Sequence, residues 1–270
     1  GISMLKEETK KDILNVSLLI KDYKKALPQY DYIYTRTNEN LNLLLKDIEV
    51  KNKKVLTVLA SSDQLFYFLL KNAKEVETFD INILTKYFFY LRKWNLLYLK
   101  EYFYPKGPLN SNYILKLLEF AKKNITTDGE EQAYLFWKNL TNRYHTIPIA
   151  HHINKTQNGI IKEEKDELIE KLKTYELKFR NINIMKKQNR NRKRHDIIFI
   201  SNIPEWYDDI EESISLKENV INLLEDDGRV IGSNILETEI PEKDLFKKEF
   251  DYIEDIPYKL GYTLQKIARK

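Results

Sequence analysis

The sequence predicts a doubly wound α/β fold with a mostly parallel sheet, and three observations carry this prediction. Short β-branched apolar runs alternate with helical runs from residue 53 onward. Polar turns follow the first two of these apolar runs. The chain closes on two short runs that are typical of an antiparallel hairpin. Together these features indicate a sheet with polar side chains along one edge.

The composition is that of a folded chain with a sizeable core. Of its 270 residues, 42% are hydrophobic and 12% aromatic. The absence of cysteine excludes disulfides, thiolate metal sites and thiol nucleophiles. A net charge of +4 is small and does not predict a nucleic-acid partner. No apolar run reaches the roughly 18 residues of a transmembrane segment, and no secretory pattern opens the chain, so we expect a cytoplasmic protein.

Residues 1–50 predict an N-terminal helical cap. Apolar residues recur with the helical period over residues 8–27. A second helix is expected over residues 38–48, with either Asn38 or Asn40 as its N-cap.

Residues 51–270 predict one α/β domain. A helical segment within it, at about 106–174, is expected to be an insertion or a lid. The apolar run that opens this domain is followed by a polar turn and then by a helical run, which is the order strand, turn, helix. The expected strands cover residues 53–60, 75–80, 175–185, 195–201 and 229–235, and the hairpin covers 249–257 and 262–270. The expected helices outside the cap and the insertion cover residues 64–73, 81–99 and 216–224.

Polar residues collect where the predicted strands end. They are Ser61, Ser62 and Asp63 after the first strand, Asp80 and Asn82 after the second, and Ser201 and Asn202 after a later one. In open α/β sheets, ligands bind outside the carboxyl ends of the strands. Asp80 lies 17 positions beyond Asp63, near the spacing of roughly 20 at which an acidic residue accepts both hydroxyls of an adenosine ribose. The pattern therefore predicts a nucleoside site.

Each of these groups also has a purely structural interpretation. Asp80 can be a turn residue at a strand end, residues 61–63 can cap the following helix, and Asn202 can belong to a plain turn before Pro204. The adjacent pair His151-His152 does not predict a metal site, because neighbouring side chains diverge and no carboxylate lies at ligand spacing.

Two further clusters each have two interpretations. The basic run RNRKR at 190–194 fits a solvated loop or an RNA contact, and we favour the loop. The aromatic clusters at 87–104 and 134–137 fit a buried core or a substrate tunnel, and we favour the core.

The segment VLTVLASSDQLFYFLLKNAKEVETFDIN resembles motifs I and II of class I S-adenosylmethionine-dependent transferases. DIIFISNIPEWYDD and LLEDDGRVIGSNI resemble motif IV and the region that follows it in these enzymes. More narrowly, YTRTNENL, SSDQ, FDIN and ISNI are together similar to a bacterial family related to the diacylglycerol 3-amino-3-carboxypropyltransferase of betaine-lipid synthesis. The resemblance covers roughly residues 32–104 and 175–270.

The resemblance implies a Rossmann-like domain that binds S-adenosylmethionine and transfers a methyl or 3-amino-3-carboxypropyl group to a small molecule or a lipid headgroup. Its implied cofactor residues are Asp80 on the ribose, Ile81 and Asn82 flanking the adenine, Asn183 near the adenine amino group, Ser201 and Asn202 facing the sulfonium, and the first turn with Ser61, Ser62, Asp63 and Gln64. Family members carry glycine in that turn, whereas this chain reads Leu59-Ala60-Ser61-Ser62-Asp63.

Residues 34–39 are expected to form a lid over the cofactor. Arg36 can offer its guanidinium fork to the methionine carboxylate, and Tyr34, Thr37 and Asn38 can bind the amino acid end. A solvated turn that only caps the next helix is the alternative.

No catalytic residue is predicted, because a sulfonium is already an activated electrophile and needs mainly a nucleophile held in line. Three functions remain open. The first is the transferase; the second is a catalytically degenerate binding or regulatory module, indicated by the glycine-free turn. The third is an RNA-modifying methyltransferase, indicated only by the basic run.

Overall fold

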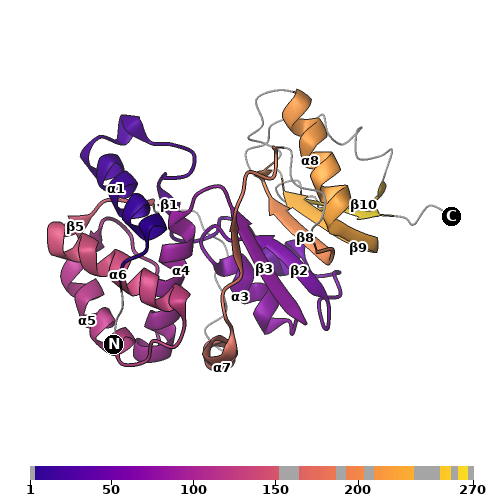
Figure 1. The fold of residues 1–270 in the computed structure, drawn as a ribbon. Coiled ribbons are helices and arrows are strands. Elements are labelled where there is room, and N and C mark those ends of the chain that lie inside the picture. Colours follow the sequence, from indigo (N-terminus) through magenta and orange to yellow (C-terminus); the bar gives the residue numbers. More distant parts are fainter. Residues whose placement is uncertain are drawn as a thin grey trace. The chain divides into compact units, whose positions relative to one another are not determined.

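The computed structural model describes residues 4–151, 164–186, 193–203, 210–233, 250–256 and 261–266 (Figure 1). The chain forms two compact units, and each gathers segments that are distant in the sequence. The first, here called the helical unit, contains Gly1–Asn38, Leu59–Asp63 and Asp80–Asn181. The second, here called the sheet unit, contains Glu39–Val58, Gln64–Phe79 and Ile182–Lys270.

In its described residues, the helical unit is built mainly from five α-helices and short strands. Its elements are α1 (Glu7–Lys21), the 3₁₀ turn η1 (Tyr23–Lys25), β1 (Ile33–Tyr34), α4 (Leu84–Trp94), the π-helical turn η2 (Asn95–Leu99), β4 (Leu109–Asn110), α5 (Ser111–Lys122), α6 (Asp128–Arg143), β5 (Thr146–Ile147), β6 (Ala150–His151), α7 (Lys165–Thr174) and β7 (Phe179–Asn181).

The sheet unit alternates strands with helices. Its elements are α2 (Leu41–Leu44), β2 (Lys54–Val58), α3 (Asp63–Leu70), β3 (Glu75–Asp80), β8 (His195–Ser201), α8 (Ile210–Leu223), β9 (Leu224–Ser233), β10 (Phe250–Ile256) and β11 (Gly261–Lys266). Asp63 and Asp80, at the ends of α3 and β3, belong to the helical unit.

The predicted cap and the predicted insertion pack together within the helical unit. Helix α1 packs against α6, and β1 pairs with β6 in parallel. The Tyr87 and Phe136 rings stack with their centroids 3.7 Å apart, and the buried Trp137 indole donates to the Tyr87 carbonyl at 2.9 Å. These contacts confirm that the aromatic clusters at these positions form core rather than a tunnel.

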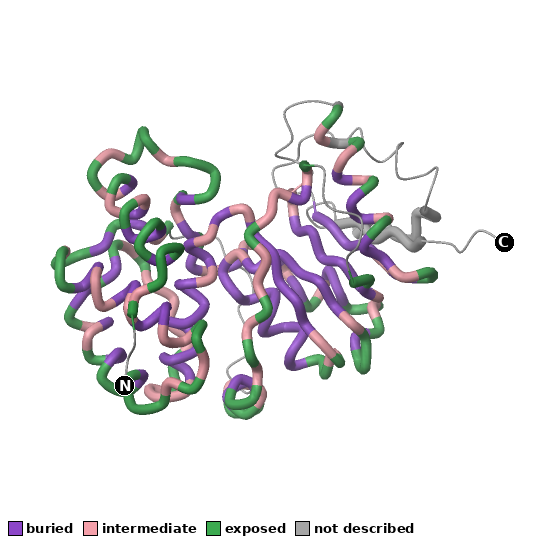
Figure 2. The backbone as a smooth tube through the Cα atoms, viewed as in Figure 1, coloured by how far each residue is buried: buried purple, intermediate pink, exposed green. Residues whose placement is uncertain are grey.

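The sheet confirms the predicted fold class. Hydrogen-bonded neighbours run in the order β10-β11-β9-β8-β2-β3, and the strands are mostly buried (Figure 2). The four strands from β9 to β3 are parallel, while β11 runs antiparallel to both β9 and β10. The connections β2-α3-β3 and β8-α8-β9 leave the centre of the sheet in opposite directions. Because such crossovers are right-handed, they place α3 and α8 on opposite faces, which is the doubly wound arrangement.

Strands β2 and β8 therefore flank the topological switch point, where open α/β sheets bind their ligands. Both strands were predicted within one or two residues of their observed bounds. Their carboxyl ends are followed by the polar residues that the sequence singled out.

Three expected elements differ from the observed ones. The helix expected over 38–48 is a single turn, α2, in which the Asn40 side chain accepts from the Leu43 N–H at 3.1 Å; its asparagines favour caps over helix interiors. The helix expected from residue 81 starts at Leu84, because the Asn82 side chain caps its first N–H. The strand expected over 175–185 is only β7.

Other bounds differ because of backbone geometry. Helix α1 ends at Lys21, before the 3₁₀ turn, and α8 begins at Ile210, earlier than expected. Residues 226–228, directly before the strand expected over 229–235, form a bulge inside β9, with Asp227 left-handed at φ 62°. Expected features at 187–192, 234–235, His152 and Pro204 lie outside the described residues. Within the described part of the chain, no helix has the length and apolar character that a membrane crossing requires.

Candidate functional site

The turn after β2 adopts a glycine-type backbone without glycine. Ala60 and Ser62 are both left-handed, at φ 44° and 77°, and the Ser62 N–H closes the turn on the Leu59 carbonyl at 2.8 Å. L-residues in this region cost roughly 1–2 kcal/mol each. The chain thus keeps the path for which glycine is normally used and adds two Cβ atoms to it.

Asp80 is held against this turn by backbone N–H groups. One carboxylate oxygen accepts from Ala60 at 2.9 Å, and the other accepts from Asn82 at 2.9 Å. Burial raises the pKa of Asp80 to about 6, although these backbone hydrogen bonds act in the opposite direction. The Ile81 N–H is a further backbone donor to this carboxylate. The donors to Asp80 among the described residues are thus backbone N–H groups, and its oxygens keep acceptor capacity for a ligand.

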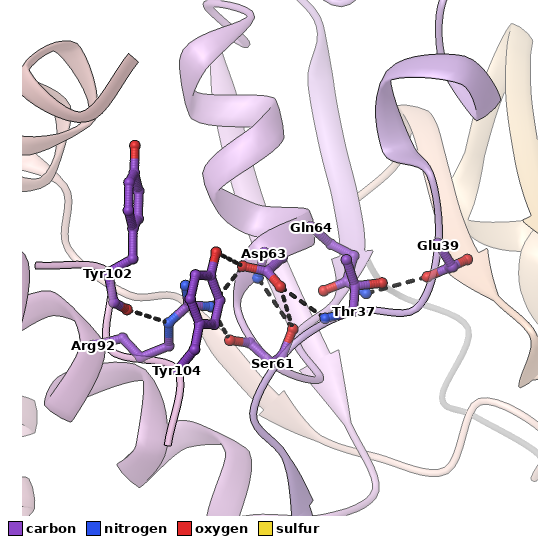
Figure 3. A network of polar contacts seen from close by, with 8 residues as sticks. All are labelled: Thr37, Glu39, Ser61, Asp63, Gln64, Arg92, Tyr102 and Tyr104. Carbon is purple, nitrogen blue, oxygen red and sulfur yellow. Dashed lines mark hydrogen bonds and ion pairs between the residues drawn. The ribbon is translucent and has the colours of Figure 1, made fainter. Parts of the chain in front are cut away.

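Asp63, at the start of α3, has by contrast all the acceptor positions of its carboxylate occupied. One of its oxygens accepts from the Arg92 guanidinium at 2.7 Å and from the Tyr104 hydroxyl at 3.3 Å. The other accepts from the Thr37 N–H at 2.8 Å and from the Ser61 hydroxyl at 3.1 Å (Figure 3). Four donors fill the four lone pairs of this fully buried carboxylate, which makes it an anchor for the surrounding chain.

Arg92 connects the anchor to two further segments. Its guanidinium also donates to the Ser61 carbonyl at 2.6 Å and to the Tyr102 carbonyl at 3.1 Å. Burial by itself would lower the pKa of Arg92, but the Asp63 carboxylate more than offsets this and the pKa lies above its usual value. Arg92 was not singled out from the sequence, and Tyr104 was considered only as the end of an aromatic cluster. The available signal was a lone arginine inside the aromatic run KYFFYLRKW.

The expected lid segment is held down at several points. Thr37 is bound to Asp63, and the Thr35 hydroxyl donates to the Pro105 carbonyl at 3.1 Å. The Arg36 guanidinium lies 4.9 Å from the centre of the Tyr104 ring. Its Nε is buried and makes no hydrogen bond to any described residue. On the same segment Tyr34 is exposed and Asn38 is half-buried, so their expected roles stay predictions.

The residues after β3 are tied to neighbouring backbone. The Asn82 amide group accepts from Leu84 and Asp31 and donates to two carbonyls of residues 31–32, so it links α4 to the segment before β1. Ile81 is half-buried, and its carbonyl accepts from the Asn181 side chain at 2.8 Å. The flanking of an adenine by residues 81 and 82 stays a prediction.

Asn181 supplies an amide beside Asp80 that the sequence analysis missed. Its Nδ2 also donates to the Asp80 carbonyl at 3.0 Å. Asn183, the expected residue, belongs to the sheet unit, where its side chain accepts from the Met185 N–H at 2.9 Å. The alternation in FRNINI gave both positions the same side of a strand, so the pattern alone could not choose between them.

The sheet unit has a cluster of polar side chains around one buried carboxylate, that of Glu39. Glu39 is buried and accepts from Gln64 at 3.2 Å, from Ser201 at 2.9 Å and from Ser233 at 2.6 Å. Ser201 and Ser233 are the last residues of the parallel neighbours β8 and β9. Half-buried Asn202 follows Ser201, whose hydroxyl lies 3.5 Å from the Asn202 side-chain oxygen.

Two members of this cluster were missed in the sequence. Ser233 ends a strand just as Ser201 does, so the same strand-end rule would have found it. Glu39 gave no local signal, because its partners lie far away along the chain.

The basic run has a structural partner at the one lysine described in it. Lys193 pairs with Glu75 and lies 3.8 Å from a Glu77 oxygen. The neighbouring His195 ring also contacts Glu77, at 3.1 Å. These contacts favour the structural interpretation of the run at this position.

No family model matches the chain, and no curated protein matches it either. Solved methyltransferase structures resemble it at TM-scores near 0.4. The glycopeptide N-methyltransferase MtfA with S-adenosyl-L-homocysteine has a TM-score of 0.40 at 11% identity, over 98% of this chain and 99% of that one. N-methyltransferase NodS from Bradyrhizobium japonicum WM9, also with S-adenosyl-L-homocysteine, has a TM-score of 0.39 at 9% identity, over 84% of this chain and 83% of that one. Ribosomal protein L11 methylase from Lactobacillus delbrueckii subsp. bulgaricus has a TM-score of 0.39 at 15% identity, over 84% of this chain and 75% of that one. Likeness at these scores assigns no function to this chain.

Proposed function

We propose that the chain binds S-adenosylmethionine at the turn after β2 and at Asp80, and transfers a methyl or 3-amino-3-carboxypropyl group to a small-molecule or lipid-headgroup acceptor. One observation supports this above all others. The glycine-type turn and the carboxylate at the end of the next strand are joined by the Ala60 N–H, as a nucleoside cradle requires.

The polar groups in the helical unit fit this cofactor. The acceptor capacity that Asp80 keeps suits the hydroxyls of a ribose. The Ser62 hydroxyl is fully buried and makes no hydrogen bond to any described residue, as is also true of the Arg36 Nε. Buried polar atoms without a partner are rare, and a polar ligand end would satisfy them. Gln64, Asn183, Ser201 and Asn202 belong to the sheet unit, and their expected cofactor contacts stay predictions.

The bound cofactor would supply a carbon attached to a sulfonium as the electrophile. The tasks left to this chain are to hold the adenosine through Asp80, to orient the methionine end through Arg36, and to keep the acceptor in line. At most one proton has to be removed from the acceptor, which agrees with the lack of an obvious acid–base pair.

Titration calorimetry tests the proposal directly. S-adenosylmethionine and S-adenosylhomocysteine should both bind to the full chain. With an acceptor present, mass analysis of the co-product separates the two reactions, because methyl transfer leaves S-adenosylhomocysteine and 3-amino-3-carboxypropyl transfer leaves methylthioadenosine. Failure of both ligands to bind contradicts the proposal.

The Arg36 assignment has its own test. Arg36→Ala should weaken S-adenosylmethionine at least about tenfold, because a charge-assisted fork to the methionine carboxylate is lost. Methylthioadenosine lacks that carboxylate and should bind as before. Arg36→Lys keeps the charge without the fork and should fall between the two. Equal loss for both ligands would leave Arg36 as part of a solvated turn.

A binding or regulatory module without catalysis is the second candidate, and the Cβ atoms of Ala60 and Ser62 favour it because they narrow the turn. Such a module would bind S-adenosylhomocysteine and still release no co-product with any acceptor. The RNA-modifying alternative is not proposed, because the one lysine described in the basic run is paired with Glu75 and Glu77.

A further inference from the structure

Helix α1 exposes apolar side chains on the face turned away from the core. Its buried face carries Ile13, Val16 and Leu19. Leu14 and Leu18, one helical turn apart, are 61% and 44% exposed. An apolar residue at these positions is not required for packing within the unit.

Further large apolar side chains are exposed just after the end of the helix. The segment that follows α1 is exposed along most of its length (Figure 2). Within it, Tyr23 is 60% exposed and Leu27 is 49% exposed. Four of the eight large hydrophobic side chains exposed in the described part of the chain thus lie between residues 14 and 27, so their distribution is concentrated.

Lysines flank this apolar surface. Five exposed lysines lie between residues 10 and 25: Lys10, Lys11, Lys21, Lys24 and Lys25. Lys11 stands three residues before Leu14, and Lys21 stands three residues after Leu18, which helical spacing places on one stripe. Lys10 pairs with Glu7 at 3.0 Å. Between residues 10 and 27 the acidic residues are the half-buried Asp22 and the buried Asp12, whose carboxylate is bound by the Tyr30 and Tyr87 hydroxyls.

We propose that this surface, made of Leu14, Leu18, Tyr23 and Leu27 with the five flanking lysines, docks on an anionic membrane. Leucine and tyrosine side chains can enter the boundary between headgroups and acyl chains, while lysine stems extend their ammonium groups to the phosphates. The anionic surface potential attracts such a basic segment. The chain would lie on the membrane through this surface, since no described helix can cross it.

The charge distinguishes a membrane from a second copy of the chain. A symmetric pairing through this surface would bring two sets of lysines together, and like charges across an interface are unfavourable. Anionic headgroups instead complement the lysines, and the acyl boundary covers the leucines. Membrane docking does not depend on a bound cofactor. It can therefore fail while the proposed function holds, and the proposed function can fail while membrane docking holds.

Vesicle flotation with the full chain tests the proposal. The chain should float with vesicles of mixed phosphatidylglycerol and phosphatidylcholine and should stay behind with phosphatidylcholine alone. Binding should weaken as salt rises, because screening reduces the attraction to the lysines. Leu14→Gln/Leu18→Gln keeps good helix formers and should lower vesicle affinity at least about tenfold. Lys21→Glu/Lys24→Glu should have an effect of similar size on the anionic vesicles.

Matched variants elsewhere serve as controls. Ile214→Gln removes an apolar side chain that is 41% exposed on α8, and Lys122→Glu/Lys123→Glu reverses two exposed lysines at the end of α5. Both controls should float like the wild type, and circular dichroism should show every variant folded. Equal flotation of the α1 variants and the wild type would overturn the proposal. Self-association in ultracentrifugation that disappears in Leu14→Gln/Leu18→Gln would also overturn it, in favour of a second copy.

Discussion

Two buried carboxylates at the ends of neighbouring strands differ in what they can still bind. Asp63, after β2, is fully buried and receives four donors, one of them the Arg92 guanidinium. Asp80, at the end of β3, is 8% exposed, and its donors among the described residues are the backbone N–H groups of Ala60, Asn82 and Ile81. A carboxylate has four acceptor positions, so the four donors to Asp63 occupy all of them, whereas Asp80 keeps acceptor capacity.

The difference distinguishes a carboxylate that anchors the fold from a carboxylate that can bind a ligand. A buried carboxylate paired with a cation and fully hydrogen-bonded fixes the segments that supply its donors. A carboxylate held only by backbone N–H groups is oriented but keeps capacity for hydroxyl donors. Strand-end position is therefore not enough to identify a binding residue, and the partners decide.

Removal of the cation should have the largest effect. Arg92→Met leaves the Asp63 carboxylate buried without its counterion, and the free energy of unfolding should fall by about 3–5 kcal/mol. Urea denaturation measures this loss. Asp63→Asn/Arg92→Met removes both charges and should recover part of the stability.

An exposed ion pair provides the control for Arg92. Lys173→Met breaks a surface pair with Glu170 whose atoms lie 2.6 Å apart. Its effect on the free energy of unfolding should stay below about 1 kcal/mol. If Arg92→Met costs no more than Lys173→Met, Asp63 does not depend on the cation and is not an anchor.

Removal of the second carboxylate should affect binding. Asp80→Ala should weaken S-adenosylmethionine about ten- to a hundredfold, because two charge-assisted hydrogen bonds to the ribose contribute roughly 1.5–3 kcal/mol. Titration calorimetry gives the dissociation constant. Asp128→Ala, at a largely exposed carboxylate on α6, should leave it unchanged. An unchanged constant in folded Asp80→Ala would remove the ribose assignment.

The pH dependence of stability should also report on Asp80. Its pKa is raised to about 6 in the folded chain, so the native state holds this proton more tightly than the unfolded state does. The stabilising contribution is complete below the unfolded pKa of about 4 and is lost as the pH rises through about 6. Relative to Asp80→Asn, the wild type should lose up to about 3 kcal/mol over that range.

Denaturation at several pH values, without cofactor, measures this difference between the two proteins. A difference that does not change with pH would mean that burial does not raise the pKa of Asp80. Added S-adenosylmethionine should reduce the loss at high pH, since the ionised carboxylate is the form that accepts two hydroxyls.

The smallest expected effect concerns the turn at residues 59–62, which directly precedes Asp63 in the sequence. Ala60→Gly should raise the free energy of unfolding by about 0.5–1 kcal/mol, because glycine adopts a φ of 44° without the Cβ penalty. Ala26→Gly, at φ −58°, should lower it by up to about 1 kcal/mol. Equal effects of the two substitutions would mean that the turn is not strained.

The sequence by itself determined the order of strands and helices from β2 to β3 and the position of Asp80. Local periodicity sets such elements, and a polar residue directly after an apolar run marks a strand end. It also showed that the first turn lacks glycine. The bounds of the helices were predicted less accurately from the sequence. Asn40 and Asn82 act as caps, and the last turn of α4 widens into η2, where the Asn95 side chain donates to the Leu91 carbonyl.

Only the tertiary structure decided which polar side chains already have all their hydrogen-bond partners within the chain. Arg92 lies 29 positions from Asp63, and Tyr104 lies 41 positions from it. Glu39 meets Ser201 and Ser233 across 162 and 194 positions. No local pattern encodes such pairs, because they depend on how separately formed elements pack, and the desolvation of a carboxylate is decided by that packing.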